Sequence, residues 1–177
     1  MEKAELITGA ELATLRESCG MSQSELGQLT GWAGPAVEDW EAGRSAVPGD
    51  VADLMIKIDT MIAESTAAAL DDLEAVRAVA SPQELSEDLV LLRYRTAEDL
   101  ARYEPGMRTV PISVHGALIG RVRLTVQVRP KLKDTPVRIV WMEPDRYEAW
   151  RKACRLPDDG STRTTWAAQQ VQVQAQP

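Results

Sequence analysis

Residues 8–48 constrain the fold more than any other part of this 177-residue chain. Two pairs in this stretch, Thr8 with Glu11 and Ser22 with Glu25, have the spacing of a capping box, which satisfies the free N–H groups at a helix start. Three short runs with helical spacing each end at a glycine, where a left-handed residue can terminate a helix. These glycines are Gly20, Gly31 and Gly43. The pattern predicts three short helices joined by two tight turns.

This order of elements is the layout of a helix-turn-helix, whose last helix enters the major groove of DNA. The stretch also resembles the Xre (Cro/CI-type) helix-turn-helix family of phage and bacterial repressors. Its tail, WEAGRSAVPGDV, is especially similar to phage regulators found beside anti-CRISPR genes and to their small bacterial relatives. The resemblance implies a five-helix, lambda-repressor-like domain with an internal ion pair, here between Arg16 and Glu41.

The resemblance also implies the DNA-contacting residues. Gln23 corresponds to the family's phosphate contact at the start of the second helix, where free N–H groups favour anions. Arg44, just after the third helix, is placed for a second contact with the DNA backbone. Ala33 stands where the family usually has a hydroxyl residue that caps the third helix. The positions that read bases in the family correspond here to Gly34, Pro35, Ala36 and Asp39.

These base-reading positions depart from the family pattern. Base edges are usually read by Arg, Lys, Asn or Gln side chains, and none of these occurs there. Asp39 can accept a hydrogen bond from a cytosine amino group, and Ala36 can touch a thymine methyl group. The departure leaves two alternatives open: a DNA-binding domain, or a helix-turn-helix fold kept as a protein-interaction module.

The charge is divided unevenly along the chain. Residues 1–50 carry a net charge of −6, residues 51–89 carry −7, and residues 90–177 carry +6. An acidic front half opposes phosphate binding, which usually dominates affinity for nucleic acids. The basic back half can therefore be a solvated face, a partner for the acidic residues, or a second nucleic-acid surface that binds RNA. Its candidate residues are Arg121, Arg123, Arg129, Lys131, Lys133 and Arg138.

Apolar residues with helical spacing predict one long helix from Gly49 to Val79. We expect it to close a helix-turn-helix domain over residues 1–80 and to present a remaining apolar stripe to a second domain or to a second copy. The fold class is therefore mainly α, with a small C-terminal α+β domain.

We place this α+β dimerisation domain at residues 89–155. Its predicted strands are residues 89–94 and 137–142, and Thr96 is expected to cap a short helix between them. Residues 113–128 fit either a strand or a helix, and we favour a helix over 113–126. The remaining residues, 156–177, are rich in Asp, Gly, Ser, Thr, Gln and Ala, a composition that predicts a flexible tail.

Several classes of protein are disfavoured. Cys19 and Cys154 cannot form a disulfide framework, and no metal-ligand spacing is present, so neither a metal nor a cofactor is expected. His115, the only histidine, lacks the neighbours of a catalytic motif, and the chain is not expected to be an enzyme. We expect neither a secretory signal nor a membrane span, because no window holds about 18 uninterrupted apolar residues.

These observations predict a cytoplasmic, homodimeric repressor of phage or bacterial origin that binds an inverted-repeat operator in double-stranded DNA, in its own promoter. Two recognition helices must then lie about 34 Å apart to enter successive major grooves. Two alternatives stay open. One is an antitoxin-like or adaptor module that binds a protein partner, and the other is RNA binding through the basic half.

Overall fold

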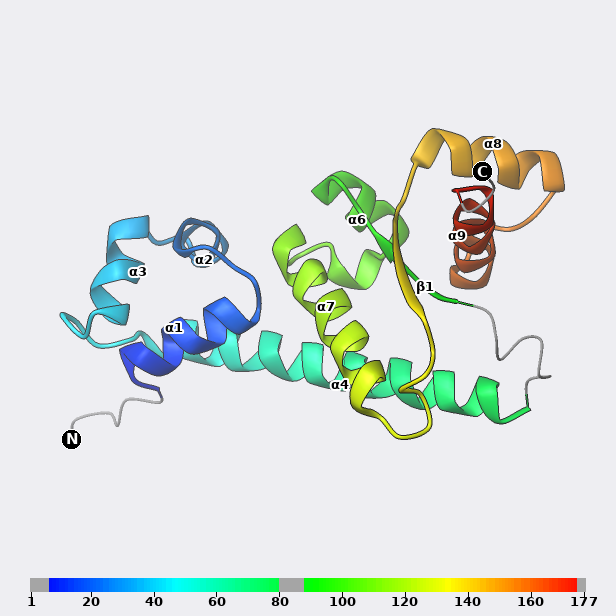
Figure 1. Ribbon diagram of the computed structural model, residues 1–177. Coiled ribbons are helices and arrows are strands. Elements are labelled where there is room, and N and C mark those ends of the chain that lie inside the picture. Colours follow the sequence, from blue (N-terminus) through cyan, green and yellow to red (C-terminus); the bar gives the residue numbers. More distant parts are fainter. Residues whose placement is uncertain (1–6, 80–87, 175–177) are drawn as a thin grey trace. The chain divides into compact units, whose positions relative to one another are not determined.

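The computed structural model describes residues 7–79 and 88–174, and these residues divide into two compact units (Figure 1). The first unit comprises residues up to Ala68 together with Thr109–Leu118. The second unit comprises Ala69–Arg108 and the residues from Ile119 onward. Each unit therefore draws on two separate stretches of the chain, and the predicted ranges 1–80 and 89–155 do not coincide with the two units.

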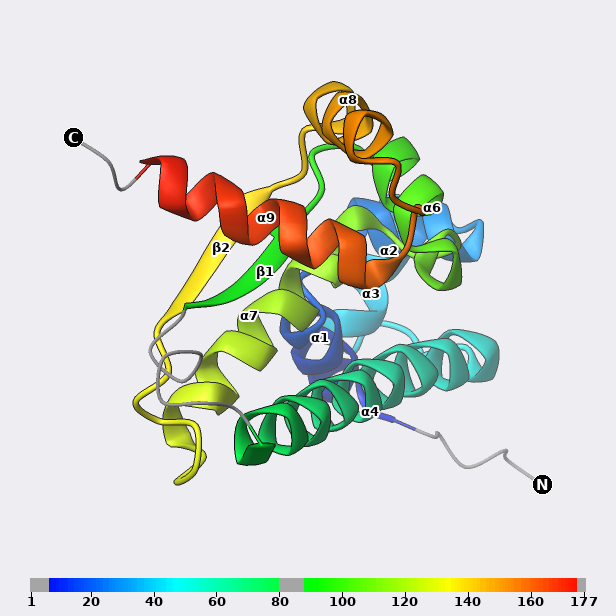
Figure 2. The same cartoon turned by 90° about the vertical axis from the view of Figure 1, so that its right-hand side faces the viewer.

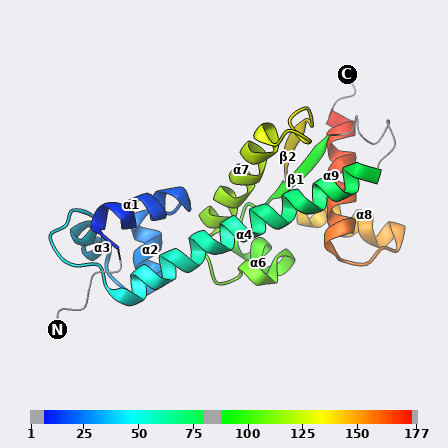
Figure 3. The same cartoon turned by 90° about the horizontal axis from the view of Figure 1, so that it is seen from below.

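The first unit contains four helices and the start of a fifth. The helices are α1 (Gly9–Ser18), α2 (Gln23–Thr30), α3 (Gly34–Glu41), the N-terminal part of α4 (Gly49–Val79) and the first residues of α7 (Ile112–Val128). Figures 1 and 3 show α1, α2 and α3 grouped beside the N-terminal part of α4. One fully buried side chain from each helix illustrates the core: Leu12, Leu26, Val37, Met55 and Val114.

Both predicted capping boxes are present. Glu11 N–H donates to the Thr8 hydroxyl at 3.2 Å, and Thr8 N–H donates to the Glu11 carboxylate at 2.7 Å. Ser22 and Glu25 repeat this reciprocal pair with distances of 3.2 and 2.7 Å. Gly31 ends α2 with a φ of 76°, in the left-handed region that costs glycine little. The local signals in the sequence therefore set the boundaries of α1 and α2.

Two glycines allow the short helices to pack closely. A Cβ atom on Gly9 would collide with the backbone carbonyl oxygen of Trp40 at the end of α3. A Cβ atom on Gly27 would lie 2.7 Å from the carbonyl oxygen of Trp32 in the turn between α2 and α3. The absence of a side chain at these positions lets α1 reach the end of α3, and lets the turn fold back onto α2.

The second unit is built around a two-stranded parallel sheet. Strand β1 (Leu89–Arg93) pairs with β2 (Val137–Trp141), and Leu89 is aligned with Val137. The sheet lies between the C-terminal part of α7 and helix α9 (Gly160–Gln174), as Figures 2 and 3 show. Its remaining elements are the C-terminal end of α4, α6 (Ala97–Tyr103), the 3-10 turn η1 (Pro105–Met107) and α8 (Pro144–Cys154).

An aromatic cluster forms the centre of the second unit. Tyr147 of α8 contacts Tyr103 edge to face, with ring centroids 5.8 Å apart, and contacts Trp166 of α9 in the same manner at 5.9 Å. Tyr103 also stacks on Tyr94 at 6.0 Å. All four rings are at most 1% exposed. This cluster joins α6 to α8 and α9, which begin about 40 residues or more further along the chain.

The prediction of a flexible tail over residues 156–177 is wrong for residues 160–174, and residues 175–177 lie outside the described part of the chain. Residues 160–174 form α9, which packs against both strands. Asp159 starts the helix, because its carboxylate accepts the Thr162 N–H at 2.8 Å. Trp166 and Ala167 are buried. A polar composition therefore does not prevent order here, because one large aromatic side chain and its small neighbour find a partner surface.

The predicted fold class is confirmed: the described residues are mainly helical, with a small α+β part. The helix favoured over 113–126 is also confirmed, since α7 spans Ile112–Val128. Thr96 caps α6 as predicted, and its hydroxyl accepts the Asp99 N–H at 3.0 Å. In the part of the chain that the structure describes, no helix is both long and apolar enough to cross a bilayer.

Candidate nucleic-acid interface

The predicted DNA-contacting residues lie on α2, α3 and the residues that flank α3. Gln23 is the first residue of α2, and Ala33 immediately precedes α3. Gly34, Pro35, Ala36 and Asp39 belong to α3, and Arg44 follows it in the next turn. The fold therefore brings all seven positions into the helix-turn-helix of the first unit, although they differ widely in exposure and in their bonding partners.

An ion pair connects α1 to the end of α3. Arg16 Nε donates to Glu41 Oε1 at 2.6 Å, and Arg16 Nη2 donates to Glu41 Oε2 at 3.0 Å. The two side chains are only 10% and 9% exposed. Arg16 Nη1 also donates to the carbonyl oxygen of Met21 at 2.7 Å, so the guanidinium holds the turn before α2. The predicted internal ion pair is confirmed.

Gln23 belongs to the same network. Its Nε2 donates to Glu41 Oε2 at 2.8 Å, so the amide is held between the start of α2 and the end of α3. Burial raises the pKa of Glu41, but hydrogen bonds from Arg16 and Gln23 outweigh it and leave the pKa below its usual value. The residue expected to contact phosphate is thus oriented by a buried carboxylate, an arrangement that the sequence did not reveal.

Arg44 has two acidic partners on α3. Its Nε donates to Asp39 Oδ1 at 2.7 Å, and its Nη2 donates to Glu38 Oε1 at 3.0 Å. All three side chains are half-exposed or more. The cation placed to contact the DNA backbone is therefore shared with two carboxylates, one of which lies at a predicted base-reading position. The signal in the sequence was a pair of acidic residues at the end of a helix, five and six residues before an arginine.

The N-terminus of α3 is small and open. Ala33 makes no side-chain capping bond, in agreement with the missing hydroxyl. A Cβ atom on Gly34 would meet no atom within 4 Å, and Pro35 is exposed. Pro35 has no backbone N–H, and the Ala36 N–H donates to the carbonyl oxygen of Ala33 at 2.9 Å, so this helix start offers few backbone donors to an anion. Its small residues allow this end of α3 to be approached closely, although it presents no side-chain donor that reads a base.

Trp32 adds an aromatic group beside this surface. It is 47% exposed, and its ring meets the buried Trp40 edge to face with centroids 5.4 Å apart. Trp32 lies at the boundary between the core and the solvent. Its ring occupies both environments, because one edge packs inward while the remainder meets solvent.

The chain matches one protein family along almost its whole length. Residues 1–171 match the family described as "Domain of unknown function (DUF4447)". The chain belongs to the DUF4447 family. No curated protein matches this DUF4447 chain. The matched region includes both units and α9 as far as residue 171, so the helix that replaces the predicted tail belongs to the family region.

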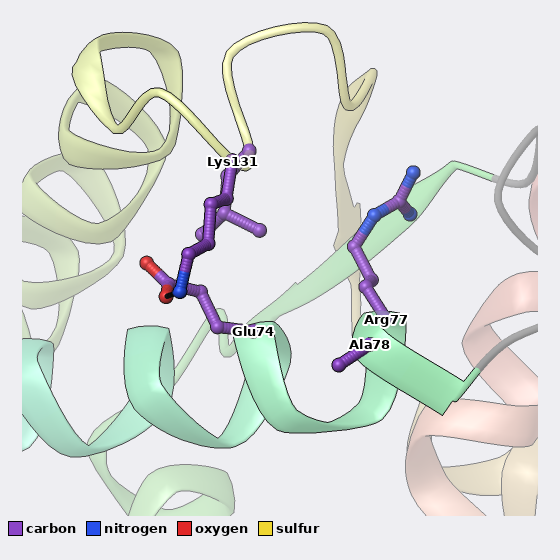
Figure 4. A pocket seen from close by; sticks show the side chains of 5 residues that line it. Glu74, Arg77, Ala78 and Lys131 are labelled. Atoms are coloured by element: carbon purple, nitrogen blue, oxygen red, sulfur yellow. Dashed lines mark hydrogen bonds and ion pairs between the residues drawn. The ribbon is translucent and has the colours of Figure 1, made fainter.

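In this DUF4447 protein the basic half also has acidic partners. Arg129 pairs with Glu74 at 3.0 Å, Lys131 pairs with Glu74 at 3.1 Å, and Arg138 pairs with Asp88 at 2.9 Å. Figure 4 shows Lys131 directed toward Glu74 at the edge of a cavity of about 370 Å³. Three of the six basic candidates therefore neutralise acidic residues of 71–88, which favours the interpretation of this set as a partner for the acidic segment.

The remaining candidate groups, the histidine and the two cysteines, differ in their location and burial. His115 and Cys19 are buried in the first unit, whereas Cys154 is exposed in the second. Across residues 7–79 and 88–174, the structure brings no three His, Cys, Asp or Glu side chains together in a group that could hold a metal ion. Arg123 and Lys133 are exposed, and Arg121 is half-buried.

Proposed function

We propose that this protein is a cytoplasmic, DNA-binding transcriptional regulator that acts as a homodimer and represses its own promoter. The proposal extends the resemblance to the Xre family from sequence to function. The observation that carries it is the arrangement of α2, the turn and α3, together with the network that orients Gln23 at the start of α2. Repression would follow from occupation of the operator, without a chemical step.

The mode of recognition follows from the small residues of α3. Gly34, Pro35 and Ala36 cannot donate a side-chain hydrogen bond to a base edge. They do allow the start of α3 to approach the floor of the major groove, where Asp39 can accept from cytosine. We propose that sequence-dependent DNA shape supplies most of the specificity, since these residues offer few side-chain groups that could contact base edges directly.

Gln23→Ala and Arg44→Ala are each expected to weaken binding to the DNA upstream of the protein's own gene. Arg44→Ala removes a phosphate contact, so it should also reduce the slope of log K against log salt by about 0.9. Fluorescence anisotropy over a series of salt concentrations measures both quantities. Arg146→Ala, which removes an exposed arginine of the second unit outside the basic set, is the matched control and should change neither. Full retention of binding by both Gln23→Ala and Arg44→Ala would contradict the proposal.

Asp39→Asn is expected to tighten binding, because Arg44 is no longer shared between its closest carboxylate and a phosphate, and because one negative charge near the DNA backbone is removed. Asp50→Asn removes the same charge from the exposed first turn of α4 and serves as the control. Weaker binding by Asp39→Asn would instead indicate that its carboxylate contacts a base directly.

A second candidate is a protein-interaction module. The observation that favours it is the half-exposed Trp32, which lies just before α3. Helix α3 itself carries the exposed carboxylates of Glu38 and Asp39. An aromatic anchor beside acidic groups suits a basic partner protein. Absence of DNA binding by the wild-type protein at low salt would favour this candidate. Loss of RNA binding in an Arg121→Ala, Arg123→Ala double variant would favour the third, RNA-binding alternative.

A further inference from the structure

Strand β2 has an unpaired edge among the residues that the structure describes, since its sheet contains only β1 and β2. A backbone hydrogen bond marks each end of the pairing between the two strands. Leu89 N–H donates to the carbonyl oxygen of Pro136 at 2.8 Å, and Met142 N–H donates to the carbonyl oxygen of Arg93 at 2.7 Å. In a parallel pair, alternate residues direct both backbone groups toward the partner strand.

The register therefore divides the backbone of β2 into two sets. Met142 directs its N–H toward β1, so Val140 and Arg138, two and four residues before it, also direct their N–H and C=O groups toward β1. Val137, Ile139 and Trp141 direct theirs to the opposite edge. Three consecutive outward positions, each with a free donor and a free acceptor, form a template for another strand.

The side chains at this edge are apolar. Ile139 is 46% exposed and Trp141 is 42% exposed, and the two residues share one face of the strand. Natural edge strands usually avoid pairing by means of an inward charge, a lysine or a proline. The only charged residue within β2, Arg138, pairs with Asp88 at 2.9 Å and does not belong to the outward set. The outer edge of β2 thus lacks the features that usually prevent an edge strand from pairing with another strand.

Trp141 is also held in place before any partner arrives. The guanidinium carbons of Arg93 and Arg95 lie 5.3 and 4.8 Å from the centroid of its ring. Arg95 is anchored in turn by Glu143 at 3.0 Å. A side chain that is already ordered loses less entropy on association. This half-exposed ring is therefore suited to an interface.

We infer that β2 pairs in the antiparallel direction with β2 of a second copy of this chain, around a two-fold axis at Ile139. This inference specifies the dimer contact of the proposed function. The sequence of β2 is complementary to itself in this register. Ile139 lies opposite Ile139 of the partner subunit, and Val137 lies opposite Trp141 of the partner subunit. Each of these pairs brings together residues whose backbone groups face outward.

The neighbouring registers are less favourable. An axis at Arg138 would place two guanidinium groups directly opposite each other, and like charges in that position destabilise a sheet. An axis at Val140 would place Val137 opposite Glu143 of the partner subunit, immediately before Pro144, where β2 has already ended. The axis at Ile139 places Arg138 opposite Val140 of the partner subunit and pairs all three outward residues within the strands.

The first test is cross-linking of single cysteine variants in a Cys154→Ser background, which removes the exposed native thiol. Residues opposite each other in a hydrogen-bonded antiparallel pair have Cα atoms about 5.5 Å apart, within the range of a disulfide. Ile139→Cys should therefore form a disulfide-linked dimer under mild oxidation. Val137→Cys should not, because its counterpart lies roughly 13 Å away, four residues along the strand. A mixture of Val137→Cys with Trp141→Cys should cross-link.

These variants distinguish the register as well as the surface. No cross-link with Ile139→Cys, or equal cross-linking of Ile139→Cys and Val137→Cys when each is oxidised alone, overturns the inference. The Cys154→Ser protein, whose remaining thiol on Cys19 is buried, is the baseline and should give no linked dimer.

The second test measures mass by light scattering at tens of micromolar. The wild-type protein should be a dimer, and Ile139→Lys should shift the dissociation constant by at least tenfold toward the monomer. Leu124→Lys makes the same change at a residue of α7 that is 61% exposed, and should leave the dimer intact. Circular dichroism checks that both variants are folded. A wild-type monomer, or a folded Ile139→Lys dimer, overturns the inference.

Failure of this inference can be separated from failure of the proposed function. A protein that cross-links at Ile139→Cys but binds no upstream DNA keeps the strand pairing and loses the regulator. A protein that binds the operator but does not cross-link keeps the regulator and loses the strand pairing.

Discussion

Arg16→Ala is expected to lower the free energy of unfolding of the first unit by about 3–5 kcal/mol, the usual cost of breaking a buried ion pair by removing one partner. Glu41 would keep its negative charge with only 9% of its side chain exposed, and only Gln23 of its side-chain donors would remain. The carbonyl oxygen of Met21 would also lose its bond from the guanidinium. Urea denaturation followed by far-ultraviolet circular dichroism measures the change.

Two further variants show whether burial is the cause. Arg44→Ala breaks ion pairs at half-exposed side chains and should cost at most about 1 kcal/mol. Replacing both members, as Arg16→Met with Glu41→Leu, should recover much of the stability lost in Arg16→Ala, because no buried charge is left alone. An Arg16→Ala protein as stable as the wild type would show that solvent reaches the pair freely.

The dependence of stability on pH should reverse in the variant. The folded wild type holds the pKa of Glu41 below its ordinary value of 4.5, so this group stabilises the fold above that value. The contribution disappears as the pH falls through the lowered pKa. Without Arg16, burial should raise the pKa of Glu41 instead, and acidification from neutral pH toward 4.5 should then stabilise Arg16→Ala relative to its own value at neutral pH.

Trp166→Ala is expected to destabilise the second unit by about 3–5 kcal/mol, the usual cost of removing a large buried aromatic side chain. Trp166 is 1% exposed, and it connects α9 to the aromatic cluster through Tyr147. The variant should leave a cavity between α8, α9 and the sheet, and part of α9 should lose its helical structure. Thermal unfolding and helical content by circular dichroism measure these effects.

The matched control for Trp166→Ala is Thr165→Ala, at the exposed residue beside it on the same helix. Its hydroxyl bonds only to the carbonyl oxygen of Ser161 within α9, so the change should stay within about 0.5 kcal/mol. Equal stability of Trp166→Ala and the wild type would restore the prediction of a flexible tail.

The sequence predicted those features that depend on neighbours within one turn. Thr8 and Ser22 form their caps with residues three positions away, and Gly31 ends α2 through its own backbone preference. The Arg16–Glu41 pair lies 25 residues apart, yet it could be predicted because the resemblance to a family implied it. Local chemistry and the resemblance to one family were therefore enough to predict the helix-turn-helix.

Features that depend on tertiary packing could not be predicted in the same way. The order of α9 depends on Trp166 meeting Tyr147, and no property of residues 156–177 alone reveals that partner. The engagement of Arg44 by Asp39 depends on how the turn after α3 folds back. The composition correctly indicated that these segments are polar. Polarity does not determine, however, whether a given side chain packs against or bonds to a distant residue.

The assembly of the first unit from two stretches has a consequence for synthesis on the ribosome. Val114 is fully buried within this unit, although α1 to α3 precede it by some 70 residues. Val114 can therefore join this core only after the intervening residues 69–108 have been synthesised, a delay of several seconds at roughly 5–20 residues per second. During that interval the apolar surface that Val114 covers is open to chaperones, and a fragment that ends at residue 80 would lack this part of the core.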